Sequence, residues 1–308
     1  MRRPEFTSTQ REHRESKKMD FDLESYKRRT SRLQWADLDL VGAFGRQPLD
    51  ADTLRCLRYM HDVEFHTVCY LRDLLLSPAH DDPEVTAFLS FWVYEEFWHG
   101  EAIAEVLAAH AEMAGPARIR ELRRSLGFRN RIAPMVTMAA GGILGEDFIA
   151  LHMTWGAINE WTTQAGYSRL SRLAGHPVLS DLVGRITRQE GRHIDFYASQ
   201  AERRLGNRPR AQRMTRFALR RFWHPVGSGV MPAAETGFLT RHLFGGDEGL
   251  AAARRIDRRI GRLPGLVGLR LLEDEVERSR AQTACTGRRR GRTPEEPVPF
   301  QGMRSAAA

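Results

Sequence analysis

The chain has 308 residues, of which 42% are hydrophobic, and this length is enough to bury a sizeable core in one or two domains. No apolar run approaches the roughly 20 residues of a membrane-spanning helix, and no apolar secretory signal stands at the N-terminus. The three cysteines (Cys56, Cys69 and Cys285) are odd in number and lack metal-binding spacing, so we expect no disulfide framework and a cytoplasmic protein.

The formal net charge of +8 has two interpretations. A basic surface favours acidic partners such as nucleic acid, an anionic membrane or an acidic carrier protein. Alternatively, the tails inflate the total, because Arg288, Arg289, Arg290 and Arg292 lie together near the C-terminus. The charge alone does not decide between these two interpretations.

The chain divides into four parts by composition. Residues 1–30 are expected to be a charged, disordered segment, because the first 20 contain few apolar side chains. Residues 31–206 are predicted to form a helical bundle, on which the segment 32–40 docks through its apolar residues. A helical extension is expected at 207–281 and a disordered tail at 282–308.

Four long helices are predicted within the bundle from their apolar periodicity and capping residues. Asp82 and Pro83, for example, are suited to the N-cap and the first position of the second helix. A long crossover over 117–145 separates the second helix from the third, so the sequence predicts an all-α four-helix bundle with one long crossover and additional C-terminal helices. The expected helices run from residue 50 or 52 to 76, from 83 to before 115, from 146 to 174, and from 177 to before 206.

The second helix carries two polar residues where its apolar stripe requires hydrophobic ones. Apolar side chains recur from Val85 to Val106 at steps of three and four residues, and Glu96 and His99 lie on the same stripe. A buried carboxylate or imidazole is costly unless it has a partner. The i, i+3 spacing lets both side chains converge on one point, which is typical of half of a di-metal site.

The other helices complete the pattern. Glu190 and His193 repeat the Glu-x-x-His arrangement on the fourth helix, and a lone acid lies on the apolar stripe of each remaining helix. Glu64 precedes Glu96 by 32 residues, and Glu160 precedes Glu190 by 30. This order matches the ligand set of the ferritin-like di-iron and di-manganese carboxylate proteins, so we expect a ferritin-like four-helix bundle. The alternative is a bundle with buried polar pairs and no metal. The predicted metal ligands are Glu64, Glu96, His99, Glu160, Glu190 and His193.

Two neighbouring residues leave alternatives open. Glu95 is the alternative to Glu96 as a metal ligand, because Glu95 and His99 are four residues apart and i, i+4 residues also lie close together on a helix. Only Glu96 lies on the stripe, so Glu95 is interpreted as a residue beside the ligands or on the surface. Thr163 lies one turn from Glu160, where its hydroxyl either bonds back to the helix or faces the metals.

Three short segments surround the predicted ligands: Glu95-Glu96-Phe-Trp-His99-Gly100-Glu101, Glu190-Gly-Arg-His193 and Glu160-Trp-Thr-Thr163. In this order, the three segments resemble the EExxHG(D/E), (D)ExRH and Glu-x-x-Thr motifs of the acyl-carrier-protein desaturases, a branch of the ferritin-like superfamily. The similarity covers roughly residues 50–205. The resemblance implies that Thr163 is a catalytic residue by the oxygen-binding site and that Trp35 belongs to an electron path. Gln189 departs from the family, which has an acid there.

The resemblance further implies an enzyme, an oxygen-dependent di-iron oxidoreductase that desaturates a long acyl chain. Its expected cofactors are two iron ions (Fe2+), with manganese as the alternative. The expected partners are acyl carrier protein or an acyl substrate, a ferredoxin-type electron donor and a second copy of the chain, but no nucleic acid. The alternatives are a di-iron oxygenase that hydroxylates or N-oxygenates a specialised metabolite, and an iron-binding ferroxidase. A channel that reaches the metals favours an enzyme, whereas a cage-forming oligomer favours the ferroxidase.

Overall fold

The computed structural model describes residues 21–126 and 129–290, and these residues form helices with no strand among them. The predicted all-α class is confirmed for this part of the chain. Within the same ranges, none of the helices combines the length and apolarity that a membrane span requires.

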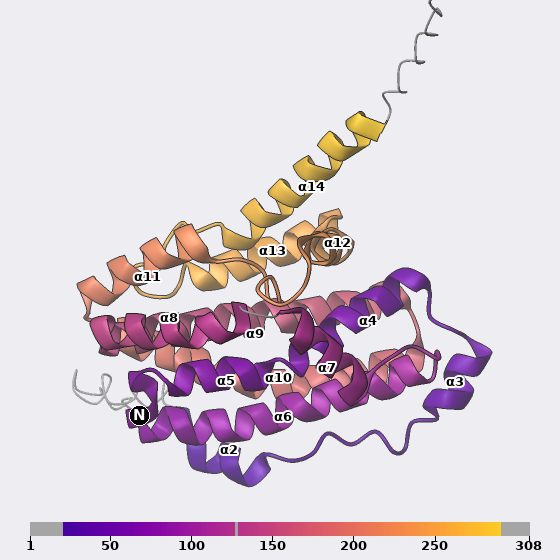
Figure 1. Cartoon of the computed structure of the whole chain (residues 1–308), viewed down its shortest axis with the longest axis horizontal. Helices are drawn as coiled ribbons and strands as arrows, with labels where there is room; N and C mark the ends of the chain where they lie inside the picture. Colours follow the sequence, from indigo (N-terminus) through magenta and orange to yellow (C-terminus); the bar gives the residue numbers. More distant parts are fainter. Residues whose placement is uncertain (1–20, 127–128, 291–308) are drawn as a thin grey trace, which may run out of the picture.

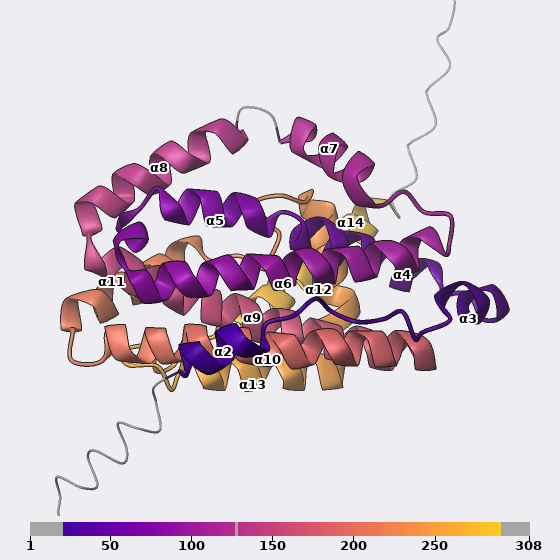
Figure 2. The ribbon, with the colours of Figure 1, turned by 90° about the horizontal axis from the view of Figure 1, so that it is seen from below.

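Four elements provide the walls of the central bundle: α4 (Ala51–Glu64), α6 (Pro83–Ala108), α9 (Glu146–Ala174) and α10 (Pro177–Leu205). The bounds of α9 and α10 are those predicted. Asp82 caps α6, because its side chain accepts hydrogen bonds from the backbone N–H groups of Glu84 and Val85. α9 packs along α10 and α4 along α6, and the pairs contact each other through α6–α10 and α4–α9 (Figures 1 and 2).

The prediction of one unbroken first helix is wrong. α4 ends at Glu64, and a separate helix, α5 (Thr67–Leu75), follows before the short 3-10 helix η1 (Pro78–Asp81). The Thr67 hydroxyl donates to the carbonyl of Glu64 at 2.6 Å, and Arg123 of a distant helix donates to the carbonyl of Phe65 at 3.0 Å. These side-chain bonds take the place of helical backbone bonds at the break. α6 is also shorter than expected, since Ala111 adopts a φ of +57° that cannot continue the helix.

The long crossover consists of α7 (Gly115–Ser125) and α8 (Arg129–Leu144), which arch over the bundle in Figure 2. The C-terminal part contains α11 (Pro209–Phe222), α12 (Ala233–Phe244), α13 (Asp247–Ile260) and α14 (Leu271–Arg290). α11, α12 and α13 pack on α9 and form a layer on one side of the bundle (Figure 1). The tail expected to be disordered from 282 continues α14 as far as Arg290; the rest of it lies outside the described residues.

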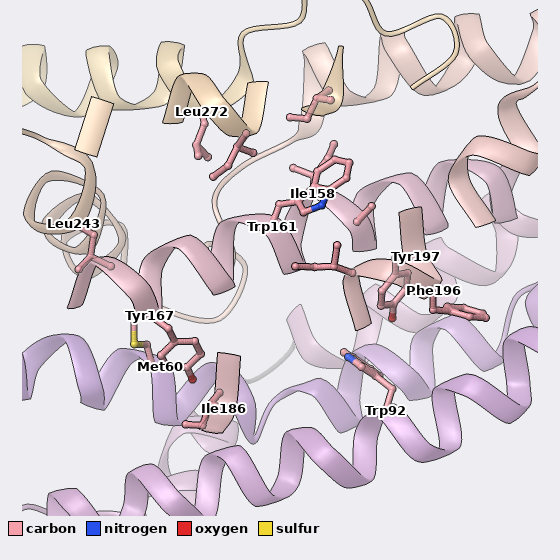
Figure 3. Packing of buried hydrophobic residues seen from close by; sticks show 14 of the residues in the cluster. Met60, Trp92, Ile158, Trp161, Tyr167, Ile186, Phe196, Tyr197, Leu243 and Leu272 are labelled. Carbon is pink, nitrogen blue, oxygen red and sulfur yellow. The ribbon is translucent and has the colours of Figure 1, made fainter. Parts of the chain in front are cut away.

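The C-terminal layer shares one hydrophobic core with the bundle. Met60 of α4 and Tyr167 of α9 belong to the same buried cluster as Leu243 of α12 and Leu272 of α14 (Figure 3). The predicted extension is therefore packed against the bundle rather than folded apart from it.

The expectation of disorder throughout 1–30 is wrong for the residues that the structure describes there. α2 (Leu23–Arg29) is a helix, and its Tyr26 is completely buried among the rings of Phe21 and Phe88. The docking predicted for 32–40 is confirmed, since Leu33 is buried, and α3 (Leu40–Arg46) follows. Residues 1–20 lie outside the described ranges.

Candidate metal centre

The six predicted ligands meet at the middle of the bundle. α4 supplies Glu64 and α9 supplies Glu160, while α6 and α10 each supply one Glu-x-x-His pair. All six side chains are buried, with at most 6% of any residue exposed. Their ligand atoms form two groups, each with all atoms within 4.8 Å of one another: Glu64, Glu96, His99 and Glu190, and Glu96, Glu160, Glu190 and His193.

Glu96 and Glu190 belong to both groups, and each histidine belongs to one. His99 Nδ1 lies 3.3 Å from one Glu190 oxygen, and His193 Nδ1 lies 3.4 Å from the other. His193 Nδ1 also lies 3.0 Å from a Glu96 oxygen. Both imidazoles therefore direct the same nitrogen at the shared carboxylates.

The outer nitrogen of each imidazole has a hydrogen-bond acceptor. His99 Nε2 lies 2.9 Å from Oε1 of Gln189, and His193 Nε2 lies 2.9 Å from a Glu95 oxygen. Because Nε2–H donates to these oxygens, the lone pair of Nδ1 remains for a metal ion. Neither acceptor could be named from the sequence, because both pairings join different helices.

Glu95 is completely buried and lies beside the ligands, so the surface alternative for this residue is wrong. In addition to His193, it accepts hydrogen bonds from Arg192 at 2.6 Å and from the Tyr26 hydroxyl at 2.9 Å. Burial raises the pKa of Glu95, but the bonds to His193 and Arg192 outweigh this and hold the pKa below its usual range. Glu95 is thus an ionised acceptor for His193.

Gln189 is the corresponding acceptor in the other half of the centre. Its amide oxygen accepts from His99, while its amide nitrogen donates to the carbonyl of Ser31 at 3.1 Å. The departure from the desaturase pattern therefore places a neutral group beside His99.

Two aromatic side chains orient the carboxylates at the ends of the cluster. The Tyr167 hydroxyl donates to Glu64, and the Trp92 indole N–H donates to Glu160 at 3.0 Å. Trp92 is thus both a buried core aromatic and a hydrogen-bond donor. Each terminal carboxylate keeps a second oxygen for the cluster.

The protonation pattern shows how strongly these groups interact. Burial and the neighbouring Glu96 charge raise the pKa of Glu64 well above its usual range, and burial raises that of Glu160 similarly. Burial lowers the pKa of His99, but the close ionic contacts with the carboxylates of Glu190 and Glu96 outweigh it and raise the pKa to about 10. The raised pKa values of Glu64, Glu160 and His99 favour the protonated forms of these groups, which reduces the negative charge of the four buried carboxylates.

A bound cation would balance the same charge. The buried atoms without a hydrogen-bond partner include Oε1 of Glu96, both oxygens of Glu190 and the Nδ1 atoms of His99 and His193. Such orphaned atoms are rare in native cores, and carboxylate oxygen and imidazole nitrogen suit iron, manganese and zinc. The residues therefore fit a metal centre.

A cavity of about 460 Å³ lies against one side of the ligands. Glu64, Glu96 and Glu160 line it, and the half-buried Thr163 lies in the same wall. The predicted position of Thr163 beside the cluster is therefore consistent with the structure, although its catalytic role is a prediction. The far wall comes from the C-terminal extension, which contributes Val226, Val230, Leu239, Leu243 and Leu272.

The loop between α11 and α12 is fixed over this cavity. The Tyr59 hydroxyl donates to the carbonyl of Val226 at 2.6 Å. Gly227 has a φ of +86°, and a Cβ atom there would lie 2.5 Å from the Tyr59 oxygen. Only glycine allows this close approach, which closes the cavity on the side of α4.

A second opening reaches Glu64 from between α5, α6 and α7. This cleft of about 1070 Å³ is lined by Phe97 and by the side chains of Arg120, Arg123 and Arg124. Its three arginines contrast with the first cavity, whose described lining contains no Lys or Arg.

The predicted electron path is consistent with the packing near His99 but is not established by it. The ring of Trp35 lies 6.2 Å from the ring of Trp98, the residue before His99. Arg32 stacks on Trp98, with its guanidinium carbon 4.1 Å from the ring centre.

Together, the fold and the site define an all-helical protein with a buried cluster of glutamates and histidines that could hold a metal ion. Comparisons with family models, curated proteins and solved structures found no match to this chain.

Proposed function

We propose that this chain is an oxygen-dependent di-iron oxidoreductase of the ferritin-like type, which acts on an organic substrate in the cavity. The observation that carries the proposal is that the two ligand groups share Glu96 and Glu190 and lie directly beside an apolar cavity. Iron storage alone gives no reason for a cavity whose wall is completed by α12, α14 and the loop between α11 and α12.

The ligand set suits two divalent ions. Glu64 and His99 would hold one ion, Glu160 and His193 the other, and Glu96 and Glu190 would join them. Four carboxylates balance two Fe2+ ions, which keeps the buried centre near neutrality. Bound iron would supply the electrons that reduce dioxygen, with manganese as the alternative metal.

The protein's own residues supply orientation and a dry environment. Trp92 and Tyr167 fix the terminal carboxylates, while Glu95 and Gln189 fix the imidazoles. The Thr163 hydroxyl can donate to a polar group on the cavity side of the cluster. The sequence has no flavin or iron–sulfur motif, so we propose an external ferredoxin-type donor.

Desaturation of an acyl chain is the first reaction to test, because the three motifs resemble those of desaturases. The second candidate is hydroxylation or N-oxygenation of a smaller molecule. It is favoured by the cavity wall, since Val226, Leu239, Leu243 and Leu272 all lie outside the stretch of resemblance, roughly residues 50–205.

The test begins with iron loading under anaerobic conditions, followed by oxygen, a ferredoxin reducing system and acyl-carrier-protein substrates. We expect two irons per chain; loss of two hydrogens from the acyl chain would establish desaturation, and gain of one oxygen would establish oxygenation. Glu96→Ala should abolish iron binding and oxygen consumption. Glu105→Ala is the control, because Glu105 lies on the same helix and is exposed. Full activity of iron-free Glu96→Ala protein would contradict the proposal.

A further inference from the structure

The cavity beside the centre contains a buried hydroxyl without a partner. Tyr197 is completely buried, lines the cavity, and its Oη has no hydrogen bond. Its ring cannot turn away, because it lies against α9 where a Cβ on Gly156 would be 2.4 Å from the ring. The ring also meets Trp92 edge-on at 6.0 Å, and in Figure 3 the hydroxyl points from α10 toward Trp92.

A second unsatisfied atom lies in the same wall. Asn159 lines the cavity, and its side-chain oxygen is buried without a hydrogen-bond partner. Asn159 follows Gly156 by three residues, so both lie on the same face of α9 as the Tyr197 ring that packs there. An unsatisfied buried donor or acceptor is costly, so the Tyr197 hydroxyl and the Asn159 oxygen together indicate a ligand that satisfies both. His66 Nδ1 is a third such atom among the lining residues.

The charges around the cavity select against an anion. Among the described residues that line it, none is Lys or Arg. Apart from the metal ligands, its acids are Asp73 and Glu275, which already pair with Arg72 and Arg278 at 2.7 Å. A carboxylate in this cavity would therefore have no Lys or Arg partner.

We propose that the cavity binds a neutral, largely apolar alcohol, phenol or arylamine, which Tyr197 and Asn159 recognise by its single polar group. The O–H or N–H of the ligand donates to Asn159 Oδ1, and the Tyr197 hydroxyl donates to the ligand's lone pair. The volume of about 460 Å³ lies in the range of small-molecule sites. The proposal rests on the proposed function in one respect: this ligand is the substrate of the second candidate reaction, hydroxylation or N-oxygenation, and is held beside Glu160.

The test measures binding to the iron-loaded full-length chain by calorimetry without oxygen, so that no turnover occurs. The probes are para-butylphenol, para-butylbenzoate and butylbenzene, which share the apolar part and differ in the polar group. We expect the phenol to bind about tenfold tighter than the other two, because only the phenol satisfies both polar atoms.

Two variants assign the polar contacts. Tyr197→Phe and Asn159→Leu should each weaken phenol binding about fivefold to tenfold and leave butylbenzene binding within about twofold. Thr154→Val is the control, since Thr154 is buried on α9 but bonds to Ala150 and does not line the cavity. Circular dichroism identifies a variant that fails to fold, in which case the other variant decides.

Two results would overturn the inference. Benzoate binding equal to or tighter than phenol binding would contradict the selection for a neutral ligand. Unchanged phenol affinity in both folded variants would remove Tyr197 and Asn159 from recognition. The proposed function is tested separately. If the chain binds the phenol but its reduced irons consume no oxygen, the binding site is supported and the proposed reaction is contradicted.

Discussion

The two halves of the centre contain the same ligand types but differ in what supports them. His193 donates to the carboxylate of Glu95, whereas His99 donates to the amide of Gln189, at the same distance of 2.9 Å. A carboxylate partner makes an imidazole a stronger metal ligand than an amide does. We therefore expect the ion at His193 to be bound more tightly than the ion at His99.

The N-terminal segment (residues 21–40) contributes to both supports. Tyr26 donates to Glu95, and the carbonyl of Ser31 accepts from Gln189. The difference between the halves thus depends on a part of the chain that lies outside the four-helix bundle. A segment expected to be partly disordered completes the surroundings of the centre.

Removal of the Glu95 carboxylate should produce the largest effect on this asymmetry. In Glu95→Ala, Arg192 and His193 lose a buried acceptor, and the affinity of the His193 half should fall about 10- to 100-fold. Equilibrium dialysis with Fe2+ should then show one tight site in place of two. The matched variant Glu95→Gln keeps the shape and should fall less, since it makes both halves amide-supported. Two sites of unchanged affinity in Glu95→Ala would contradict the assigned role.

A carboxylate in place of Gln189 should make the metal affinities of the two halves more similar, because both histidines would then donate to a carboxylate. Gln189→Glu gives His99 an ionised acceptor, so its affinity should rise about tenfold or less. The gain is limited because the new carboxylate faces the carbonyl of Ser31, which accepted the amide hydrogen. In the same dialysis experiment, the binding constants of the two sites should become closer in value. Constants that stay as far apart, or become more different, would mean that Gln189 does not affect the affinity of His99.

The ligands could be predicted because they combine two local patterns. A glutamate or histidine on an apolar stripe is conspicuous in the sequence, and repetition of Glu-x-x-His on a second helix adds an independent constraint. The ends of α9 and α10 follow from similarly local signals, since Pro177 begins α10 and residue 175 is a glycine. All six ligands accordingly lie together in the structure.

The remaining features depend on contacts between distant residues. No Pro or Gly marks the break after Glu64, where Arg123 binds the carbonyl of Phe65 from 58 residues away. Tyr26 is the aromatic residue of a charged helix, and its burial requires the Glu95 acceptor on α6. The part of the cavity wall that the C-terminal extension contributes likewise depends on contacts between residues far apart in the sequence. Periodicity identifies the buried face of a helix but not which element covers it.

The smallest expected effect concerns how the N-terminal segment is held. Arg185 of α10 donates to the Asp37 carboxylate at 2.6 and 2.7 Å, and these bonds lower the pKa of Asp37 to about 2. Since the pKa is lower in the folded state, the contact stabilises the segment above the ordinary Asp pKa. That contribution should be lost as the pH falls from about 4 to about 2.

Hydrogen exchange of residues 21–40 over this pH range measures the contribution of Asp37. The wild-type segment should lose protection on acidification, after correction for the intrinsic pH dependence of exchange. Asp37→Asn should already show the lower protection at pH 5 and change less on acidification, since its side chain does not titrate. The bond from Arg185 to the carbonyl of Gln34, at 2.9 Å, should preserve part of the contact in that variant at pH 5. Equal protection of both proteins across the range would show that Tyr26 and Leu33, rather than Arg185, hold the segment beside the centre.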